Sequence, residues 1–294
     1  MILIDLNQVL LSGLMAQIAG QKNVKLEEGL VRHLVLNIIR GHVRQFRQEY
    51  GEVVLCCDNK KYWRKEFFPF YKAGRKKTRE KSDLDWHLIF DILGKIKQEL
   101  KDNFPYRVID VDGAEADDII GYLAHKFENF PETQEINIMS ADQDFLQLVS
   151  TKTSVYSPTK KKIYKPKDVF EQFGVSATNY INYKILFGDK SDNIQGIEGL
   201  GEKTLIKLFP QMQEKTCTVQ ELLDIARNIP QKKPIKTLSN ILTGKTKSTI
   251  LGEEFYTTNK KIVDLTNPLI TTDGKKLVEQ ILTDTIDPTD RGYK

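Results

Sequence analysis

Acidic side chains gather in short stretches of this sequence, and most of these stretches follow an apolar segment. EADD (115–118), ADQD (141–144) and GDKSD (188–192) each hold two or three carboxylates, and single aspartates follow the apolar runs 1–4 and 53–57. One aspartate can cap a helix, and one acid in a first turn complements the helix dipole. Capping does not explain clusters. The candidate set is Asp5, Asp58, Glu115, Asp117, Asp118, Asp142, Asp144, Asp189 and Asp192.

Nine carboxylates in one place would repel each other, and some would stay protonated unless cations neutralised them. Mg²⁺ prefers carboxylate oxygens and water, and it keeps room for a phosphate. No histidine or cysteine lies in these stretches, which argues against zinc. Two such ions suit phosphodiester hydrolysis, because one generates a hydroxide and the other stabilises the leaving oxygen. The acids therefore predict a two-metal hydrolytic centre.

A basic segment follows the second apolar run. Residues 60–81 contain ten basic and two acidic residues, a net charge of +8, with six aromatic residues in the first half. Such a run is often only a solvated face. Aromatic rings among basic side chains also suit nucleic acid, since rings stack on bases while charges follow the phosphates. The segment begins just after Asp58, so we expect it at the mouth of the acidic crevice.

A glycine-rich motif, GIEGLGEKTL (196–205), follows the last acidic stretch directly. Its glycines permit a tight turn between two helices, and the backbone N–H groups of such a turn can hold a phosphate. A plain helix–helix turn remains the alternative. The residues concerned are Gly196, Gly199, Gly201, Lys203 and Thr204. For Lys160–Lys162 we expect an exposed β-hairpin turn rather than a phosphate contact.

These motifs need a scaffold, and the hydrophobic pattern supplies one. Apolar strands at 1–4, 53–57, 106–112 and 135–140 alternate with amphipathic helices at 26–50, 84–100 and 114–127. This alternation is typical of an α/β fold with a mostly parallel sheet and helices on both faces. Ligands of such sheets bind at the carboxyl ends of the strands, where most of the acids fall. From 166 to about 265 the pattern is helical. We expect a core at 1–187, including the basic segment at about 60–90, and a helical region at 188–294 packed on it.

Composition excludes several classes. The chain has 294 residues and a net charge of +4, which excludes extreme polyanions and histone-like chains. It has no apolar run long enough to cross a membrane, and its first residues lack the basic leader of a signal peptide. The three cysteines, Cys56, Cys57 and Cys217, are expected to be buried thiols in a reducing compartment. We therefore expect a cytoplasmic location.

Taken together, the motifs over residues 1–210 resemble the structure-specific 5′-nuclease (flap endonuclease) family. The resemblance includes the acids after two strands, the segment RKEFFPFYKAGR (64–75), EADD, ADQD, GDKSDN and GIEGLGEKT. The basic segment and DLDWHLIF (83–90) are most similar to phage members. The resemblance implies a PIN-like core sheet, a helical arch and a helix–hairpin–helix. It also implies two Mg²⁺ ions, which Mn²⁺ can replace.

By motif position, the resemblance assigns Asp5, Asp58, Glu115, Asp117, Asp118 and Asp142 to the first metal, and Asp144, Asp189 and Asp192 to the second. Lys72 and Arg75 match a basic pair that contacts the scissile phosphate, and Tyr71 would stack on or steer the substrate. Further DNA contacts fall to Arg64, Lys76, Lys77 and Arg79. The glycine-rich hairpin would bind the duplex backbone, with a monovalent cation.

The implied activity is 5′→3′ exonuclease and flap cleavage of RNA–DNA hybrids and duplex DNA, which removes RNA primers from lagging-strand fragments. The implied partners are branched or nicked duplex DNA, RNA–DNA hybrid, a single-strand DNA-binding protein and a sliding clamp, with the enzyme a monomer.

Three alternatives stay open: a PIN-type single-strand endoribonuclease, a non-catalytic structure-specific DNA-binding protein, and a Mg²⁺ phosphatase. The basic segment and the hairpin argue against the endoribonuclease and the phosphatase. The complete acid set argues against a non-catalytic DNA-binding protein. Past residue 215 no motif maps.

Overall fold

The computed structural model of the chain describes residues 1–19, 26–82, 84–129, 135–230 and 235–286. Its centre is a six-stranded sheet in the order β3-β2-β1-β4-β5-β6. The strands are β1 (Ile2–Asp5), β2 (Val53–Cys57), β3 (Arg107–Asp110), β4 (Ile136–Met139), β5 (Thr153–Ser157) and β6 (Lys162–Tyr164). The first five are parallel and β6 pairs antiparallel with β5, which confirms the predicted mostly parallel sheet and the hairpin at 160–162.

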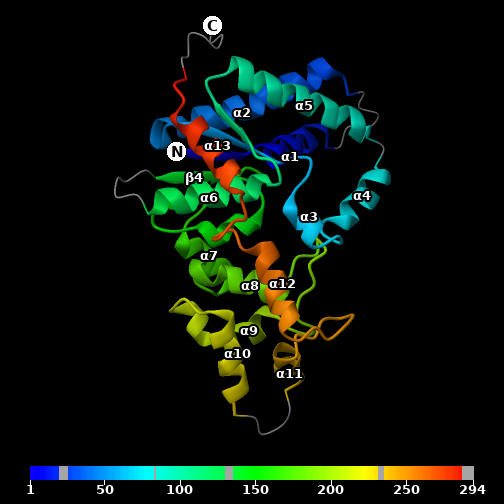
Figure 1. Ribbon diagram of the computed structural model, residues 1–294, viewed down its shortest axis with the longest axis vertical. Coiled ribbons are helices and arrows are strands. Elements are labelled where there is room, and N and C mark those ends of the chain that lie inside the picture. Colours follow the sequence, from blue (N-terminus) through cyan, green and yellow to red (C-terminus); the bar gives the residue numbers. More distant parts are fainter. Residues whose placement is uncertain (20–25, 83, 130–134, 231–234, 287–294) are drawn as a thin grey trace.

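Helices cover both faces of the sheet, because the central strands carry apolar side chains on both faces and each face must be shielded from water. Figure 1 shows α2 (Glu28–Tyr50) and α5 (Trp86–Asn103) above the sheet and α6 (Ala116–Glu128) below it. With α1 (Leu6–Ile18), α2 and α5 form one hydrophobic cluster, while α6 belongs to a second cluster on the other face. The three cysteines are buried thiols, as predicted.

The helix boundaries follow capping side chains more than hydrophobic periodicity. The α5 helix begins at Trp86 and not at 84, because the Asp85 carboxylate accepts a hydrogen bond from Leu88 N at 3.0 Å. The α6 helix begins at Ala116 and not at 114, because Glu115 caps it. The α2 helix ends where predicted, at Gly51, whose φ of 79° suits glycine.

The basic segment forms two short helices that stand beside the sheet: α3 (Trp63–Phe67) and α4 (Ala73–Glu80) (Figure 1). A five-residue loop, 68–72, joins them and turns at Lys72, which has a φ of 57°. No residue of α4 is buried. The predicted arch segment therefore presents its charges to solvent over α4 and anchors itself at α3.

The second half of the chain is helical, as predicted. It contains the α-helices α7 (Pro166–Phe173), α8 (Tyr180–Phe187), α9 (Glu202–Leu208), α10 (Val219–Asn228), α11 (Lys236–Leu242), α12 (Glu253–Val263) and α13 (Thr272–Thr283). The 3₁₀ turns are η1 (Gln143–Leu148), η2 (Ala177–Asn179) and η3 (Pro210–Gln213). None of the helices in the described ranges is both long and apolar enough to cross a membrane.

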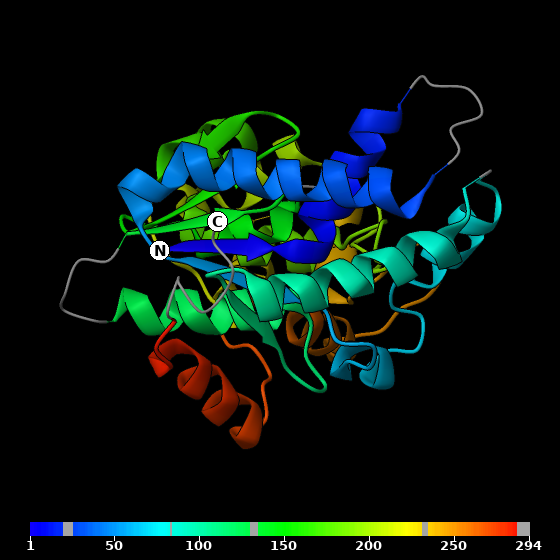
Figure 2. The ribbon, with the colours of Figure 1, turned by 90° about the horizontal axis from the view of Figure 1, so that it is seen from above.

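The last helix returns to the sheet instead of ending in the helical region. Viewed from above, α13 lies beside α6, on the side away from α2 (Figure 2). Tyr122 Oη donates to Glu279 at 2.8 Å, and the Arg107 guanidinium donates to the carbonyl oxygens of Ile281 and Asp284. One hydrophobic cluster runs from the sheet into these helices. The division at 187/188 therefore stays a prediction.

Candidate active site

The acids lie at the point where the chain changes direction across the sheet. From β1 the chain builds outward to β2 and β3, and it then returns to place β4 on the other side of β1. Three of the acids lie at the ends of neighbouring strands. Asp5 ends β1, Asp58 follows β2, and Asp142 follows β4. Loops diverge at such a switch point and leave a crevice at the carboxyl ends of the strands.

Short side chains fix these acids in place. Asp5 caps α1 by accepting from Gln8 N at 3.2 Å, and its second oxygen accepts from Ser140 Oγ at 3.0 Å. Asp58 accepts from Asn7 Nδ2 at 3.1 Å and from Ala116 N at 2.9 Å, which joins β2 to the start of α6. Asn7 and Ser140 were not predicted. Their only signal in the sequence is that each adjoins a strand end.

Burial and mutual repulsion raise the pKa values of several of these acids. Burial, with the charges of Asp58 and Asp142, raises the pKa of Asp5 to about 8. Burial and Asp142 raise the pKa of Asp144 to about 7, although Lys184 opposes this. Burial also raises the pKa of Asp117 well above its usual value, and Glu115 and Asp142 add to that effect. Such groups need a positive charge nearby if they are to ionise together.

Basic side chains provide part of that charge. Lys72 Nζ lies 2.6 Å from Glu115 Oε1, and Arg75 lies 2.6 Å from Asp192 Oδ1. In the described part of the chain, no three acidic, histidine or cysteine side chains are already arranged around a metal position. Lys72 and Arg75 therefore each lie against an acid of the candidate set, while the role of these acids as metal ligands and their split between two metal sites stay predictions.

Lys184 lies among the acids of the site, and the sequence analysis did not single it out. Its Nζ bridges Asp144 Oδ1 at 2.5 Å and Asp189 Oδ2 at 2.6 Å. Burial alone would raise the pKa of Asp189, but Lys184 and Ser191 hold it below its usual value. Lys184 lies on α8, whose other buried side chains are apolar or uncharged. A lone lysine in such a helix, shortly before an acidic stretch, was the available signal.

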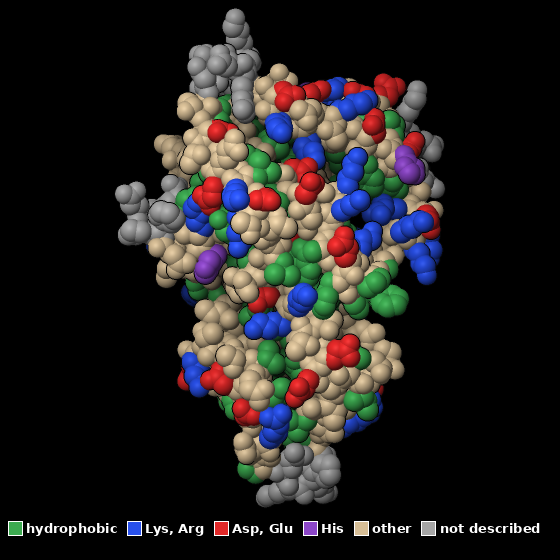
Figure 3. Space-filling model, in the orientation of Figure 1, with side chains coloured by type: hydrophobic (Ala, Val, Ile, Leu, Met, Phe, Trp, Pro, Cys, Tyr) green, Lys and Arg blue, Asp and Glu red, His purple; other side chains and the backbone are tan. Residues whose placement is uncertain are grey.

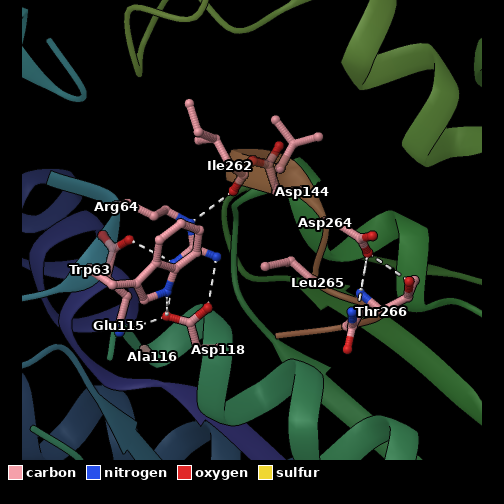
Figure 4. A network of polar contacts seen from close by, with 12 residues as sticks. Trp63, Arg64, Glu115, Ala116, Asp118, Asp144, Ile262, Asp264, Leu265 and Thr266 are labelled. Atoms are coloured by element: carbon pink, nitrogen blue, oxygen red, sulfur yellow. Dashed lines mark hydrogen bonds and ion pairs between the residues drawn. The ribbon is translucent and has the colours of Figure 1, made fainter. Parts of the chain in front are cut away.

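The structure corrects the roles expected of Arg64 and Asp118. Arg64 is only 1% exposed, so it is not a surface contact for DNA. Its guanidinium donates to both oxygens of Asp118 at 2.8 Å and to Glu115 Oε2 at 2.9 Å (Figure 4). Trp63 Nε1 also donates to Asp118, at 3.2 Å. Because Asp118 is fully buried and both its oxygens are occupied, it holds Arg64 rather than facing the crevice.

Tyr71 also differs from the expectation. It is 2% exposed, so its ring has no free face on which a base could stack. Lys72 Nζ lies 4.7 Å from the centre of this ring, and Tyr62 packs edge-on against it. Tyr71 therefore helps to position Lys72. The burial follows from the turn at 68–72, which directs the ring inward.

A segment near the end of α12 closes the back of the site. Arg64 Nε donates to Ile262 O at 2.8 Å (Figure 4). Gln147 Nε2 donates to Asp144 O at 2.8 Å and to Val263 O at 2.9 Å, while its Oε1 accepts from Leu265 N. The backbone of 262–265 is thus fixed to both the arch side and the Asp144 side of the crevice. The sequence showed no motif in this region.

Lys76, Lys77 and Arg79, predicted to bind DNA, are on α4. Lys76 is 82% exposed and its ion pair with Glu80 is loose, at 3.9 Å. Figure 3 shows Lys and Arg side chains gathered over the region of α4. These side chains remain available to an anion, and their role in DNA binding stays a prediction.

The glycine-rich motif turns at Glu198 and Gly199, within the longer connection of residues 188–201 between α8 and α9, so the expected tight turn is only part of this connection. A side chain on Gly196 would lie 2.0 Å from Phe187 O, and Gly199 has a φ of 74°, so both positions favour glycine. Gly201 caps α9, which places Lys203 and Thr204 in its first turn. Glu198 N donates to Lys245 O at 2.9 Å, which joins the hairpin to the segment after α11. The expected hairpin is present, and its contact with DNA and a monovalent cation stays a prediction.

Comparison with known proteins finds relatives of this sequence. Ribonuclease H of Enterobacteria phage T4 is 38% identical over 200 residues, which are 67% of this chain and 62% of that protein. DNA polymerase I of Thermus filiformis is 34% identical over 205 residues, 68% of this chain and 22% of that protein. This chain therefore matches less than two thirds of the length of these relatives.

The fold has solved counterparts. A bacteriophage T5 flap endonuclease, determined in a pseudo-enzyme–product complex with DNA and metal ions, matches with a TM-score of 0.71. The match covers 96% of this chain and 97% of that one at 21% identity, which supports the fold. The family model for the 5′-3′ exonuclease N-terminal resolvase-like domain matches residues 1–174, more than half of the chain. The protein therefore belongs to the 5′-3′ exonuclease family.

Proposed function

We propose that the protein is a Mg²⁺-dependent 5′→3′ exonuclease and flap endonuclease that hydrolyses phosphodiester bonds in RNA–DNA hybrids and duplex DNA. The observation that carries the proposal is the meeting of buried, mutually repelling carboxylates with Lys72 and Arg75 at the sheet switch point. An all-oxygen donor set suits hard divalent cations such as Mg²⁺, and Mn²⁺ fits the same ligands.

The acids divide into two groups that would hold two ions. By motif position, Asp5, Asp58, Glu115, Asp117 and Asp142 would hold one ion, and Asp144, Asp189 and Asp192 the other, with Asp118 left out because it is buried against Arg64. Asp144 Oδ1 is buried and contacts Lys184 Nζ at 2.5 Å, so an ion that bound there would replace this lysine as the partner of the carboxylate. When bound, the ions would supply an activated water and stabilise the leaving oxygen.

The chain's own cations would act on the phosphate. Burial alone would lower the pKa of Lys72, but Tyr71, Glu115 and other nearby acids raise it well above its usual value, so Lys72 stays charged. Arg75 is likewise charged and half-exposed beside Asp192. Lys72 and Arg75 would leave their carboxylates if Glu115 and Asp192 each served as a ligand of one of the two ions. They could then bind the scissile phosphate.

We further propose that the enzyme removes RNA primers from lagging-strand fragments, with branched or nicked duplexes as substrates. The relatives support a role in replication, since they include a phage ribonuclease H and DNA polymerases I. The exposed charges of α4 and the hairpin next to GDKSD fit a duplex that reaches the crevice with one strand end. A single-strand DNA-binding protein and a sliding clamp remain candidate partners.

A substrate panel tests the activity. The full chain is incubated with a 5′-labelled flap, a nicked duplex and an RNA–DNA hybrid, with Mg²⁺ or with a chelator. We expect short 5′ products only with Mg²⁺. The matched variant is Asp142→Asn, which keeps size and polarity but removes one metal ligand, and it should cut at least about 100-fold more slowly while binding DNA normally. Binding without any cleavage by the wild type would favour a non-catalytic DNA-binding protein.

A further inference from the structure

An aromatic pocket that the proposed mechanism does not use lies below the arch segment. It encloses about 510 Å³ between the end of α3 and the segment from Thr249 to Asn259. Phe67, Phe68 and Phe70 form one wall, and Leu251 lies on the other. Phe70 is 64% exposed and Phe67 39%, so these rings serve the core only in part. Figure 3 shows hydrophobic side chains here, just below the cluster of Lys and Arg.

The pocket is held at a fixed place relative to the acidic crevice. The carbonyl oxygen of Phe70 accepts from Asn193 Nδ2 at 3.0 Å. One residue earlier, the Asp192 carbonyl accepts from Lys72 N at 3.0 Å, and the Asp192 carboxylate pairs with Arg75. The rings are therefore joined to the basic pair by both a short loop and these bonds. A strand held at Lys72 and Arg75 would have its neighbouring nucleotides beside the pocket.

Basic side chains lie next to the pocket, although its own lining contains the acidic Glu254 and no basic residue. Lys261 Nζ lies 4.0 Å from the centre of the Phe67 ring. On the opposite wall, Ser248 Oγ donates to Gln195 Oε1 at 2.7 Å, which fixes this wall to the start of the glycine-rich hairpin. The exposed Lys247 lies two residues before Thr249, where this wall begins. The pocket thus lies between the two surfaces predicted to bind phosphates, and it offers ring faces rather than further charge.

We propose that this pocket binds an unpaired nucleobase of the substrate, stacked on Phe70. In a duplex both faces of a base are covered by its neighbours, so only an unpaired nucleotide can offer a face to a ring. Stacking on an aromatic ring is tolerant of sequence, as a nuclease that acts on many junctions requires. The polar side chains of Glu254 and Thr258 on the wall can bind the base edge. This proposal rests on the proposed function, because it assumes a nucleic-acid substrate.

Binding measurements without metal test the pocket separately from catalysis. The full chain, in chelator, is titrated into a fluorescent duplex with an unpaired 5′ arm and into a blunt duplex of equal length. We expect Phe70→Ala to weaken binding of the armed duplex roughly five- to tenfold and to leave the blunt duplex unchanged. Phe70→Trp should restore the affinity. The matched control is Phe170→Ala, since Phe170 is also a half-exposed ring, on α7.

An abasic scan locates the bound nucleotide. Replacing one arm nucleotide at a time by an abasic site should abolish the difference between wild type and Phe70→Ala at one position only. Equal losses for both duplexes, or no loss, would overturn the proposal. So would a wild type that elutes as a dimer while Phe70→Ala elutes as a monomer, because the patch would then join two copies. If the wild type bound neither duplex, the proposed function would fail as well; if it cleaved flaps but Phe70→Ala bound them normally, only the pocket would fail.

Discussion

At the level of single residues, the buried carboxylates of the site repel one another, and the nearby lysine and arginine side chains only partly offset this repulsion. Asp5, Asp117 and Asp144 all have raised pKa values because they are buried among other acids. Lys72 and Lys184 neutralise neighbouring carboxylates through contacts of 2.5–2.6 Å. The residues that favour binding of a cation therefore weaken the folded state when no divalent cation is bound.

Asp5→Asn should stabilise the metal-free protein at pH 8. The pKa of Asp5 is about 8 in the folded chain and about 3.8 when unfolded, so the folded state binds the proton more tightly. Its contribution is most favourable below pH 4 and is lost as the pH rises to 8. Asparagine can still cap α1, but it carries no charge, so this loss disappears. We expect the free energy of unfolding of the variant to exceed that of the wild type by on the order of 1–3 kcal/mol at pH 8 and to differ little at pH 4.

Urea unfolding in chelator at the two pH values measures this effect. Adding Mg²⁺ at pH 8 should stabilise the wild type more than the variant, since the variant has lost a ligand. Equal stability of both proteins at pH 8 without metal would show that Asp5 is not under electrostatic strain.

Lys72→Ala should lower the rate of cleavage far more than the affinity for DNA. Lys72 is partly buried beside Glu115 and is one cation among many basic side chains, so it should add little to overall binding. Near the scissile phosphate its loss should cost roughly 100-fold in single-turnover rate, with affinity changed less than about threefold. Lys167→Ala, an exposed lysine on α7, is the control. Equal losses of rate and affinity would make Lys72 a simple phosphate clamp.

At the scale of elements, a buried ion-pair network joins α3, α6 and the end of α12. Arg64 on α3 contacts Asp118 on α6 and the backbone of Ile262. Gln147 on η1 holds Val263 and Leu265 from the other side. The short helix α3 and the acidic crevice thus both contact residues 262–265 at the end of α12. These contacts hold α3 in place.

Arg64→Met should destabilise the fold, because it leaves Asp118 charged, buried and unpaired. We expect a loss of about 3–5 kcal/mol in the free energy of unfolding, part of which Arg64→Met with Asp118→Leu should recover. Arg227→Met breaks an exposed pair with Asp224 and should cost less than about 1 kcal/mol. Denaturant titrations measure all three. If Arg64→Met were as stable as the wild type but bound DNA weakly, Arg64 would instead be a direct contact for DNA.

At the scale of the whole molecule, the net charge of +4 is a cancellation. Without the nine acids of the crevice the chain would carry +13, and residues 60–81 alone carry +8. Figure 3 shows the basic side chains of the arch region gathered on one side of this face. Under the proposed function, the separation of an acidic crevice from a basic surface would attract a phosphate backbone and bring it to the site.

The salt dependence of binding should report this surface. Each neutralised phosphate contributes about 0.7–0.9 to the slope of log affinity against log salt concentration. Replacing Lys76, Lys77 and Arg79 by alanine should lower the slope by about 2–3. The control replaces the exposed Lys101, Lys167 and Lys276 on α5, α7 and α13. An equal fall in both triple variants would mean that net charge alone, and not α4, binds the substrate.

The sequence alone predicted strands β1 to β4, the acids at their ends and the basic pair near them, while β5 and β6 were foreseen only through the hairpin turn at 160–162. Apolar strands alternating with amphipathic helices allow few arrangements, and parallel strands bring Asp5, Asp58 and Asp142 to one edge. The tertiary structure alone decided that Arg64, Asp118 and Tyr71 turn inward, and that Lys184 and the 262–265 segment join the site. Local spacing shows which residues share an element. Whether a charged side chain faces solvent or a buried partner depends on contacts between residues far apart in the chain, such as Arg64 and Ile262.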